Sequence, residues 1–504
     1  MNASRRYLGN YILGQFVQVH DANGEVLSTN PGNLDAPSIK CAFSFEHIHE
    51  AVVAAQRGTV AWRRLALSDR LAALSVYRQK LAGANERAAE LISFETGKPL
   101  WEAREEIAET LCVVDYYLDA AKQTAIETAG QDGACATRIN HYPRGVAAII
   151  SPAISPILDV HLHLIPALAY GNTVVLKASR QAPLVGQLIA EIANEAALPA
   201  GALNLVQGDG EVARRLVSHS EIQMVLYTGS YETGLKIEKQ VVADYGKVVV
   251  LDMVGKNGAL VWGDCDYAQA LHETLYSAFL TSGQRRTTAS RVLVQRTLFD
   301  KFLADFHALA KKASIGYGLT ETDGPFMGPL LNDEAVENYI RYQGIAVREG
   351  CEEIMRGKSL ERNPKGHYVS PSIHLVGKAD PKSVYQKSEI FGPNVALYPV
   401  DDLDEAVEIL NLSQHGLVAS IYSQDRSVFL RACENVRVGT MHWNRPTHTP
   451  TYRLPRGGLK KSGNARVMGS TAWQQCTYPV ASTEGAAKWD TASLPASLPR
   501  KDKE

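Results

Sequence analysis

The sequence predicts a doubly wound α/β fold, with two series of parallel strands and helices that follow a helical region. Three observations predict it. Residues 45–127 carry apolar side chains at helical spacing. Past residue 140, short β-branched runs alternate with helical segments, and a second series of the same kind begins at residue 258. Continuous apolar runs of this length are typical of parallel strands that are buried on both faces.

The helical region contains three stretches with apolar residues every three or four positions. They predict helices over residues 47–65, 68–95 and 101–121. Ser68 stands at the start of the second stretch as an N-cap, because a serine hydroxyl accepts hydrogen bonds from the free N–H groups of a first turn. Leu71 follows three residues later, so the glutamate of a capping box is absent.

The strands are predicted from short apolar and β-branched runs that are bounded by glycine or polar residues. The first series gives strands over residues 146–150, 173–178, 202–208, 223–229 and 247–253. The second series gives strands over residues 258–263, 291–295, 395–400, 417–423 and 439–444. From residue 482 onward the chain is polar and rich in Pro and Ser, which predicts an extended arm or tail.

Composition limits the classes of protein to which the chain belongs. Its 504 residues are too many for one core and predict two or three domains. Hydrophobic residues make up 45% and charged residues 21%, as in a soluble globular protein. With 52 Lys+Arg against 54 Asp+Glu the net charge is −2, so neither a nucleic-acid partner nor a membrane partner is expected.

The cysteines indicate the compartment. Seven are scattered along the chain, without a CxxC pair or a Cys/His cluster at metal-ligand spacing. An odd, dispersed set predicts reduced thiols in a cytoplasmic protein, with no disulfide framework and no metal site. The N-terminus lacks an apolar core long enough for a signal peptide, and prolines and polar residues interrupt the most apolar region, residues 146–176.

Three short motifs have the residue types of a nucleotide site. Gly229 to Gly234, between a strand and a helix, would let backbone N–H groups approach a pyrophosphate. Lys177 and Ser179, at the end of the strand predicted over 173–178, would contact a ribose or a phosphate. Residues 389–393 place a carboxylate and an aromatic ring around a tight turn. Taken singly, each is also explained as an ordinary turn or a surface lysine.

Together and in this order, the motifs resemble the aldehyde dehydrogenase superfamily. Its members carry KPSE, FTGSxxxG, LExGG, GQxC and EIFGP in that sequence. Within the superfamily the chain looks most like the succinylglutamate semialdehyde dehydrogenases, the branch of arginine catabolism. The resemblance extends from about residue 45 to residue 499, through the stretches ETGKPLWEA, PALAYGNTVVLKAS, GALNLVQG, TGSYETG, SAFLTSGQR, SEIFGP, WNRP and LPASLP.

The resemblance implies three structural parts and a tail. These are a nucleotide-binding α/β domain over 1–134, 148–255 and 442–467, a catalytic-type α/β domain over 256–441, a β oligomerisation arm over 135–147 and 468–490, and a tail over 491–504. It also implies a homodimer or homotetramer, because an unpaired arm would expose sheet edges. Pairing of the arm with an active relative would give a heteromer instead.

The chain departs from the family at the positions that carry the chemistry. In the family a cysteine thiolate attacks the aldehyde, an asparagine helps to stabilise the oxyanion and a glutamate activates water. Here these positions hold Arg286, Ile154 and Asp252. A guanidinium stays protonated and only donates hydrogen bonds, isoleucine has no donor, and aspartate is one methylene shorter than glutamate. We therefore predict a degenerate active site.

Other side chains are poor substitutes for the missing thiol. Cys265 lies in a turn that the family fold places away from the cleft. Thr288, where close relatives have a second cysteine, and Thr287 and Ser282 would each need a neighbouring base, and this stretch contains no histidine.

The cofactor motifs are better preserved than the catalytic positions. The positions that match are Lys177, Ser179, Gly229, Ser230, Gly234, Glu389 and Phe391. Arg180 replaces the glutamate of KPSE, and a cation beside the adenosine ribose would favour a 2′-phosphate, hence NADP over NAD. Alternatively, Arg180 or Arg286 fills the site and no dinucleotide binds.

Three interpretations of Arg286 stay open on the sequence. It pairs with Asp252 or Glu389 and neutralises the cavity. With Arg285 it binds an anionic small molecule. It takes part in catalysis. The sequence thus predicts either a binding, regulatory or structural subunit without thiol chemistry, or an NAD(P)-dependent oxidoreductase or other enzyme with Asp252 as base.

Overall fold

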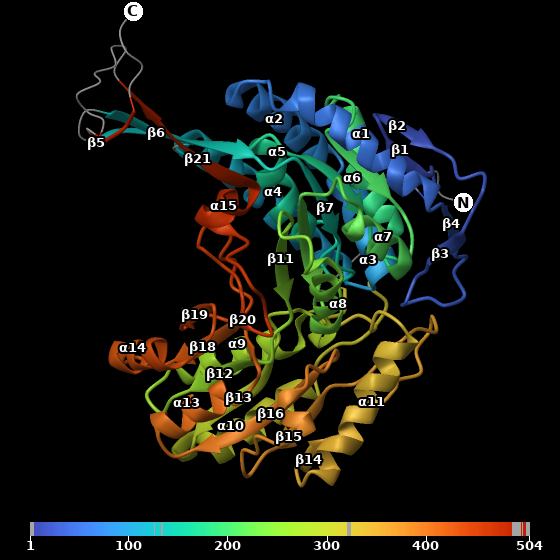
Figure 1. The fold of residues 1–504 in the computed structure, drawn as a ribbon. Coiled ribbons are helices and arrows are strands. Elements are labelled where there is room, and N and C mark those ends of the chain that lie inside the picture. Colours follow the sequence, from blue (N-terminus) through green and yellow to red (C-terminus); the bar gives the residue numbers. More distant parts are fainter. Residues whose placement is uncertain are drawn as a thin grey trace, which may run out of the picture.

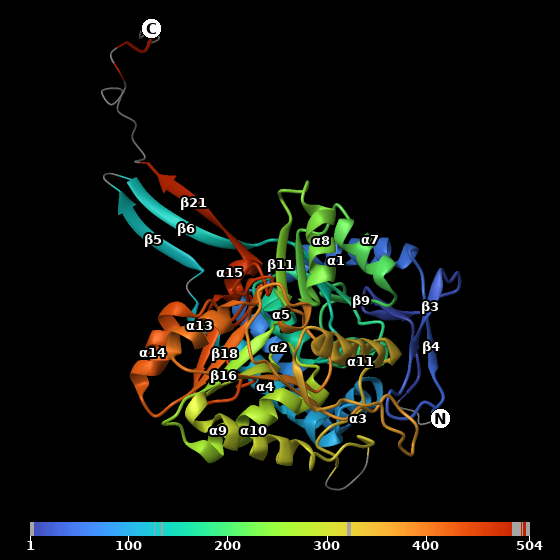
Figure 2. The same ribbon diagram turned by 90° about the horizontal axis from the view of Figure 1, so that it is seen from below.

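A computed structural model describes residues 5–124, 126–132, 135–319, 324–485, 495 and 497–499 of the chain. It contains two large sheets, each covered by helices, and a smaller sheet that projects from the body as an arm (Figures 1 and 2). The predicted α/β class is therefore confirmed. Of the predicted tail, 491–504, all but residues 495 and 497–499 lie outside the described residues.

The first sheet has seven strands in the order β11-β10-β7-β8-β9-β1-β2. The five strands of the first predicted series are present and parallel: β7 (Val146–Ile150), β8 (Thr173–Lys177), β9 (Leu203–Val206), β10 (Met224–Gly229) and β11 (Val248–Met253). The N-terminal strands β1 (Asn10–Ile12) and β2 (Gln15–Val17) add an antiparallel edge that the sequence did not predict. They are too short for a repeating pattern of apolar residues.

Helices surround this sheet and continue its core. They are α1 (Glu46–Trp62), α2 (Leu67–Gly83), α3 (Asn85–Thr96), α4 (Leu100–Gln123), α5 (Leu158–Ala169), α6 (Pro183–Glu195), α7 (Gly210–Ser218) and α8 (Tyr231–Val241). The predicted helix over 68–95 is two helices, which separate at Ala84, where φ is −93° and ψ is 7°. The predicted N-cap Ser68 was wrong, because it lies inside α2, whose N-cap is Ala66.

The second sheet also has seven strands, in the order β14-β15-β16-β13-β12-β18-β19. All five strands of the second predicted series are present: β12 (Asn257–Val261), β13 (Ala289–Gln295), β16 (Asn394–Val400), β18 (Val418–Tyr422) and β19 (Thr440–Trp443). The edge strands β14 (Glu352–Met355) and β15 (Ser372–Leu375) complete it. Its helices are α9 (Tyr267–Phe279), α10 (Arg296–Ala310), α11 (Asp333–Arg348), α12 (Val384–Lys387), α13 (Leu403–Asn411) and α14 (Arg426–Asn435).

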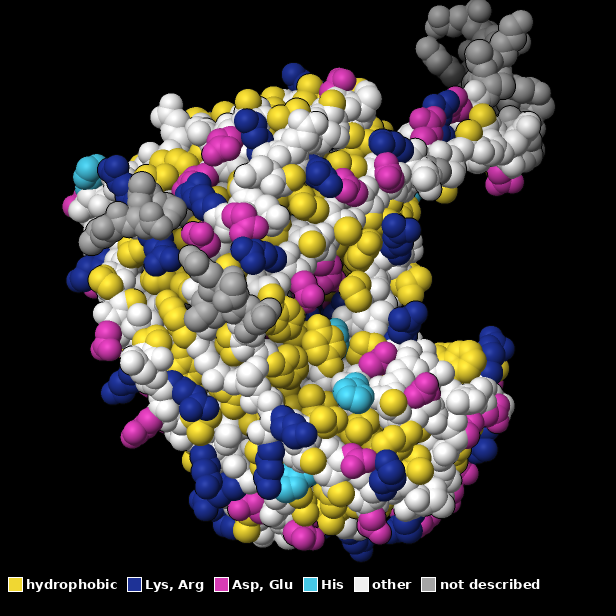
Figure 3. Space-filling view, turned by 180° about the vertical axis from the view of Figure 1, so that it is seen from behind, with side chains coloured by type: hydrophobic (Ala, Val, Ile, Leu, Met, Phe, Trp, Pro, Cys, Tyr) yellow, Lys and Arg dark blue, Asp and Glu magenta, His cyan; other side chains and the backbone are white. Residues whose placement is uncertain are grey.

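The arm is a three-stranded antiparallel sheet of β5 (Glu127–Asp132), β6 (Cys135–Pro143) and β21 (Thr477–Glu484). Its strand β21 follows the short helix α15 (Ala472–Cys476), and the arm stands clear of the body (Figure 3). Strand β5 lies within the range 1–134 that we assigned to the nucleotide-binding domain, yet it pairs with β6. The boundaries between domains remain predictions.

Two small pairs of strands complete the fold. They are β3 (Gly24–Ser28) with β4 (Ile39–Phe43), and β17 (His415–Gly416) with β20 (Leu459–Lys460). In the part of the chain that the structure describes, every helix is too short or too polar to cross a lipid bilayer.

Candidate functional site

A cleft of about 700 Å³ opens at the carboxyl ends of β7, β8 and β10. Strands β7 and β10 are neighbours in the sheet. The chain leaves β7 toward β8 on one side and leaves β10 toward β11 on the other, so the two connections run in opposite directions. In open α/β sheets ligands bind at such a switch point, because the diverging loops leave a crevice there. The loops after β7 and β10 both line the cleft.

The loop that presents Arg286 is held in an unusual backbone conformation. Thr281, Ser282 and Gly283 have φ of 55°, 53° and 70°, a left-handed run that is costly for the first two residues. The side-chain amide of Asn257 donates to the Arg286 carbonyl over 2.8 Å. The loop is therefore fixed by the fold, and its guanidinium points into the cleft.

Arg286 is paired with two buried carboxylates. Its Nη2 donates to Oδ1 of Asp159 over 2.9 Å, and its Nη1 lies 2.5 Å from Oδ2 of Asp252. The second contact is an ion pair without the alignment of a hydrogen bond. Burial alone would lower the pKa of the Arg286 guanidinium. The two facing carboxylates outweigh burial and raise this pKa above its ordinary value. Arg286 therefore stays charged at any working pH.

One of these partners was expected, and the other was not singled out in the sequence. We expected Asp252 or Glu389 as the partner of Arg286; Asp252 takes that place, and Asp159 is a second partner. Asp159 lies in the first turn of α5, where every residue from Asp159 to Ala169 is buried. A lone aspartate in so apolar a helix was a signal of a buried ion pair, since a buried charge needs a partner.

The other altered position also faces the cleft. Ile154 lies in the loop after β7, lines the cleft and is 9% exposed, so an apolar side chain stands at the position that we predicted for the oxyanion donor. No cysteine lines the cleft within the described ranges. Cys265 lies elsewhere, and burial together with its two flanking aspartates raises the pKa of its thiol to about 11. The Ser282 hydroxyl donates to a backbone carbonyl, whereas Thr287 lines the cleft.

The second arginine of the loop is also engaged. Arg285 donates from Nη2 to Oε1 of Glu102 over 3.0 Å and from Nε to Oγ1 of Thr281 over 2.8 Å. Glu102 lies on α4 and its side chain is fully buried. An anion in the cleft would have to compete with this carboxylate for Arg285, as it would with Asp159 and Asp252 for Arg286.

Six of the eight predicted cofactor positions line the cleft. Those that line it are Lys177, Ser179, Arg180, Gly229, Ser230 and Phe391. Ser230 caps α8, so the N-terminus of this helix faces the cleft. Lys177 is 5% exposed, and burial lowers the pKa of its ammonium group to about 8. It makes no side-chain hydrogen bond with any described residue, so its donors are available to a ligand.

Two predicted cofactor positions do not line the cleft. Gly234 lies inside α8 against Met253 of β11, where a Cβ would overlap the sulfur, so this glycine lets the helix pack on the sheet. Glu389 lies in the loop before β16, and burial followed by the like charge of Glu232 raises the pKa of its carboxyl group to about 8.

The sequence did not single out three further charged or titratable residues of the site. His163 on α5 shares a 2.9 Å hydrogen bond with Thr228, and burial lowers the pKa of its imidazole to about 4. Glu109 and Arg456 line the cleft. In the described ranges no three His, Cys, Asp or Glu side chains are grouped to hold a metal ion.

Comparisons with known proteins agree on one family. The model of the aldehyde dehydrogenase family matches residues 22–481. The chain is 34% identical over 480 residues to N-succinylglutamate 5-semialdehyde dehydrogenase of Burkholderia mallei, which covers 95% of this chain and 97% of that protein. The protein of the same name from Novosphingobium aromaticivorans is 33% identical over 442 residues, 87% of this chain and 92% of that one.

Solved structures give the same result for the fold. Aldehyde dehydrogenase C from Pseudomonas syringae, a mutant in complex with NAD+ and octanal, superposes with a TM-score of 0.88 at 27% identity, over 94% of this chain and 96% of that one. Lactaldehyde dehydrogenase superposes with a TM-score of 0.90 at 28% identity, over 95% and 99% of the two chains.

Proposed function

The chain belongs to the aldehyde dehydrogenase family, and from this we propose that it is a member without thiol-dependent aldehyde oxidation, which acts as a binding, regulatory or structural subunit. One observation carries the proposal. The side chain at the nucleophile position is Arg286, and it is held by Asp159 and Asp252. A guanidinium has no lone pair to attack a carbonyl carbon.

The two remaining altered positions support the same conclusion. Ile154 offers no hydrogen to a developing oxyanion, and removal of one such donor costs roughly 3–4 kcal/mol in hydrolases. Asp252 would be the base, but its Oδ2 faces the guanidinium at 2.5 Å. Nucleophile, oxyanion donor and base are each unsuited to the family's reaction.

The test is an assay of NADH and NADPH formation with N-succinylglutamate 5-semialdehyde and with simple aldehydes. The Burkholderia mallei relative is the positive control. We expect no reduced cofactor from this chain. Steady reduction together with a covalent adduct on any residue of the cleft would overturn the proposal.

A second candidate function is a non-thiol reaction in the same cleft, with Asp252 as base and a nicotinamide dinucleotide as hydride carrier. It is favoured by Lys177, whose donors face the cleft without a partner in the described chain. Turnover of a compound from a metabolite pool, and its loss in Asp252→Ala, would support it. The ion pair of Asp252 makes it the less favoured candidate.

We propose NADP as the dinucleotide that the cleft holds. Lys177, Ser179 and Ser230 would contact its phosphates and ribose, and exposed Arg180 would face the 2′-phosphate. Calorimetry should give about fivefold tighter binding of NADP than of NAD, the effect of one exposed ion pair. The order should reverse in Arg180→Glu.

The matched control is Lys239→Glu, which makes the same change of charge on α8 away from the cleft and should leave the preference unchanged. Absence of heat with both dinucleotides would contradict the cofactor proposal. It would favour the alternative that the arginines fill the site.

We also propose that the arm joins protomers into a homodimer or homotetramer. Tyr142, Tyr478 and Val480 lie on one face of the arm and are 45%, 42% and 41% exposed. Light scattering should give a multiple of the 55.0 kDa chain mass for the native protein and a smaller species for the double variant Tyr478→Lys, Val480→Lys.

The control is Glu361→Lys. Glu361 is an exposed residue between β14 and β15 of the second sheet, and its replacement should leave the mass unchanged. A native mass of one chain would contradict the proposal. Co-purification from the native host would show whether an active relative takes the place of the second copy.

A further inference from the structure

Two opposite charges at one end of the cleft lack partners. Glu109 lies on α4, and Arg456 lies between β19 and β20 in the segment that returns toward the first sheet. Both line the cleft, and neither side chain makes a hydrogen bond or an ion pair with any other residue that the structure describes. Partly buried charges are costly unless something pairs with them, so both are suited to contact a ligand.

The two charges influence each other without contact. Burial raises the pKa of the Glu109 carboxyl group, and the positive charges of Arg285 and Arg456 oppose that rise. Burial lowers the pKa of the Arg456 guanidinium and Arg286 lowers it further, whereas the negative charges of Asp252, Asp159 and Glu109 oppose the decrease. Each side chain thus lies in the field of the other, yet no ion pair closes between them.

The neighbouring charges are already paired. Arg285 is held by Glu102, and Arg286 by Asp159 and Asp252. At this end of the cleft, Arg456 is therefore the arginine with free donors and Glu109 is the carboxylate with free acceptors, as far as the described residues show. His448 also lines the cleft, with a buried Nδ1 that has no hydrogen-bond partner among the described residues.

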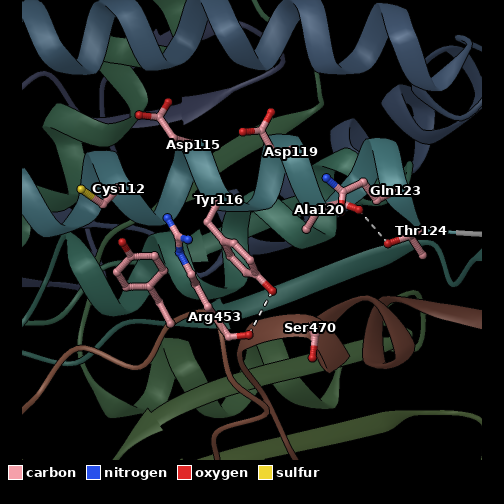
Figure 4. Close-up of a pocket in the computed structure, with 10 residues that line it drawn as sticks. Cys112, Asp115, Tyr116, Asp119, Ala120, Gln123, Thr124, Arg453 and Ser470 are labelled. Atoms are coloured by element: carbon pink, nitrogen blue, oxygen red, sulfur yellow. Dashed lines mark hydrogen bonds between the residues drawn. The ribbon is translucent and has the colours of Figure 1, made fainter.

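The end of the cleft that holds the two charges continues toward the protein surface. Tyr452 lines both the cleft and an outer groove of about 550 Å³. The groove lies between α4 and the returning segment, where Tyr116 donates from its hydroxyl to the Arg453 carbonyl over 3.2 Å (Figure 4). A small molecule that enters through this groove would pass α4 and reach Glu109.

We propose that Glu109 and Arg456 bind a small zwitterion, an α-amino acid or a compound with an ammonium and a carboxylate group at similar spacing. Arg456 takes the carboxylate as a planar, two-donor partner, and Glu109 takes the ammonium. The inference rests on the proposed function, since it names the ligand class of the same cleft. It excludes dianions such as N-succinylglutamate 5-semialdehyde, whose nitrogen is acylated and whose second carboxylate Glu109 would repel.

Calorimetry with matched probes tests the proposal on the full-length protein. The probes are L-glutamine, N-acetyl-L-glutamine without the ammonium group, L-glutaminamide without the carboxylate, and glutarate with two carboxylates. L-glutamine should bind at least about tenfold more tightly than each of the others, the effect of one hydrogen bond between charged groups.

Two variants assign the contacts. Glu109→Gln should weaken L-glutamine about tenfold without weakening N-acetyl-L-glutamine, and Arg456→Gln should weaken both. The controls are Glu105→Gln, one turn earlier on α4, and Arg453→Gln in the outer groove; neither residue lines the cleft, and neither change should alter the affinity.

Equal or tighter binding of glutarate, no heat with any probe, or an unchanged affinity in Glu109→Gln would each overturn the inference. These results are separate from the proposed function. Aldehyde oxidation by the native chain would contradict the proposed loss of thiol chemistry and leave the binding results intact. Preference for the dianion would contradict only the proposal that the ligand is a zwitterion.

Discussion

Replacement of Arg286 by methionine is expected to lower the free energy of unfolding by about 3–5 kcal/mol, because it leaves two buried carboxylates without their cation. Asp159 and Asp252 have side chains only 9% and 1% exposed, so water cannot take the place of the guanidinium. Urea denaturation followed by circular dichroism measures the change. An effect of this size would show that the arginine neutralises the cavity.

The matched control is Arg296→Met. Arg296 pairs with Asp401 on the surface, where both side chains are more than half exposed, and the expected loss is below about 1 kcal/mol. The rescue is the triple variant Arg286→Met, Asp159→Asn, Asp252→Asn, which removes the charges and should recover most of the loss. Equal losses in Arg286→Met and Arg296→Met would show that the buried network contributes little.

Restoration of the family's cysteine alone is expected to give no measurable aldehyde oxidation. In Arg286→Cys, the thiol would lie where Asp159 and Asp252 now face the guanidinium, and negative charge raises a thiol pKa and lowers the fraction of reactive thiolate. Ile154 would still give the oxyanion no hydrogen bond, a loss of roughly 3–4 kcal/mol in the transition state.

The triple variant Arg286→Cys, Ile154→Asn, Asp252→Glu restores all three positions and should exceed Arg286→Cys by about a hundredfold or more in kcat/KM. Addition of Asp159→Asn should raise the rate further, because it removes the remaining carboxylate beside the thiol. NADH and NADPH formation with a panel of aldehydes measures these rates, and thiol alkylation against pH measures the thiolate. Activity of Arg286→Cys within tenfold of the triple variant would contradict the role given to Ile154.

The strands show how much of the fold can be predicted from local sequence patterns. β7, β8 and β10 were predicted because a parallel strand that is buried on both faces reads as an unbroken apolar run. The edge strands β1 and β2 were missed, since three residues carry no periodicity and β1 joins the sheet by pairing Tyr11 with the distant Leu205 of β9. The helix boundary at Ala84 was missed because the apolar pattern continues through it.

The candidate site, too, was predictable from the sequence only in part. The predicted loss of thiol chemistry rests on the identity of residue 286 alone, because protonation and nucleophilicity belong to the functional group. The ion-pair partners of that functional group cannot be derived from its identity. Asp159 was not weighed as a partner and Glu389 was, since only the packed fold brings α5 and the loop of Arg286 together.

By itself, the sequence determined the α/β class and the places of the central strands along the chain, and it predicts the replacement of nucleophile, oxyanion donor and base. These are properties of single residues or of short patterns along the chain. Only the tertiary structure decided which carboxylates neutralise Arg286 and that Glu109 and Arg456 have no ion-pair partner among the residues that the structure describes. Ion pairing depends on distances between residues far apart in the chain, and only the packed fold sets those distances.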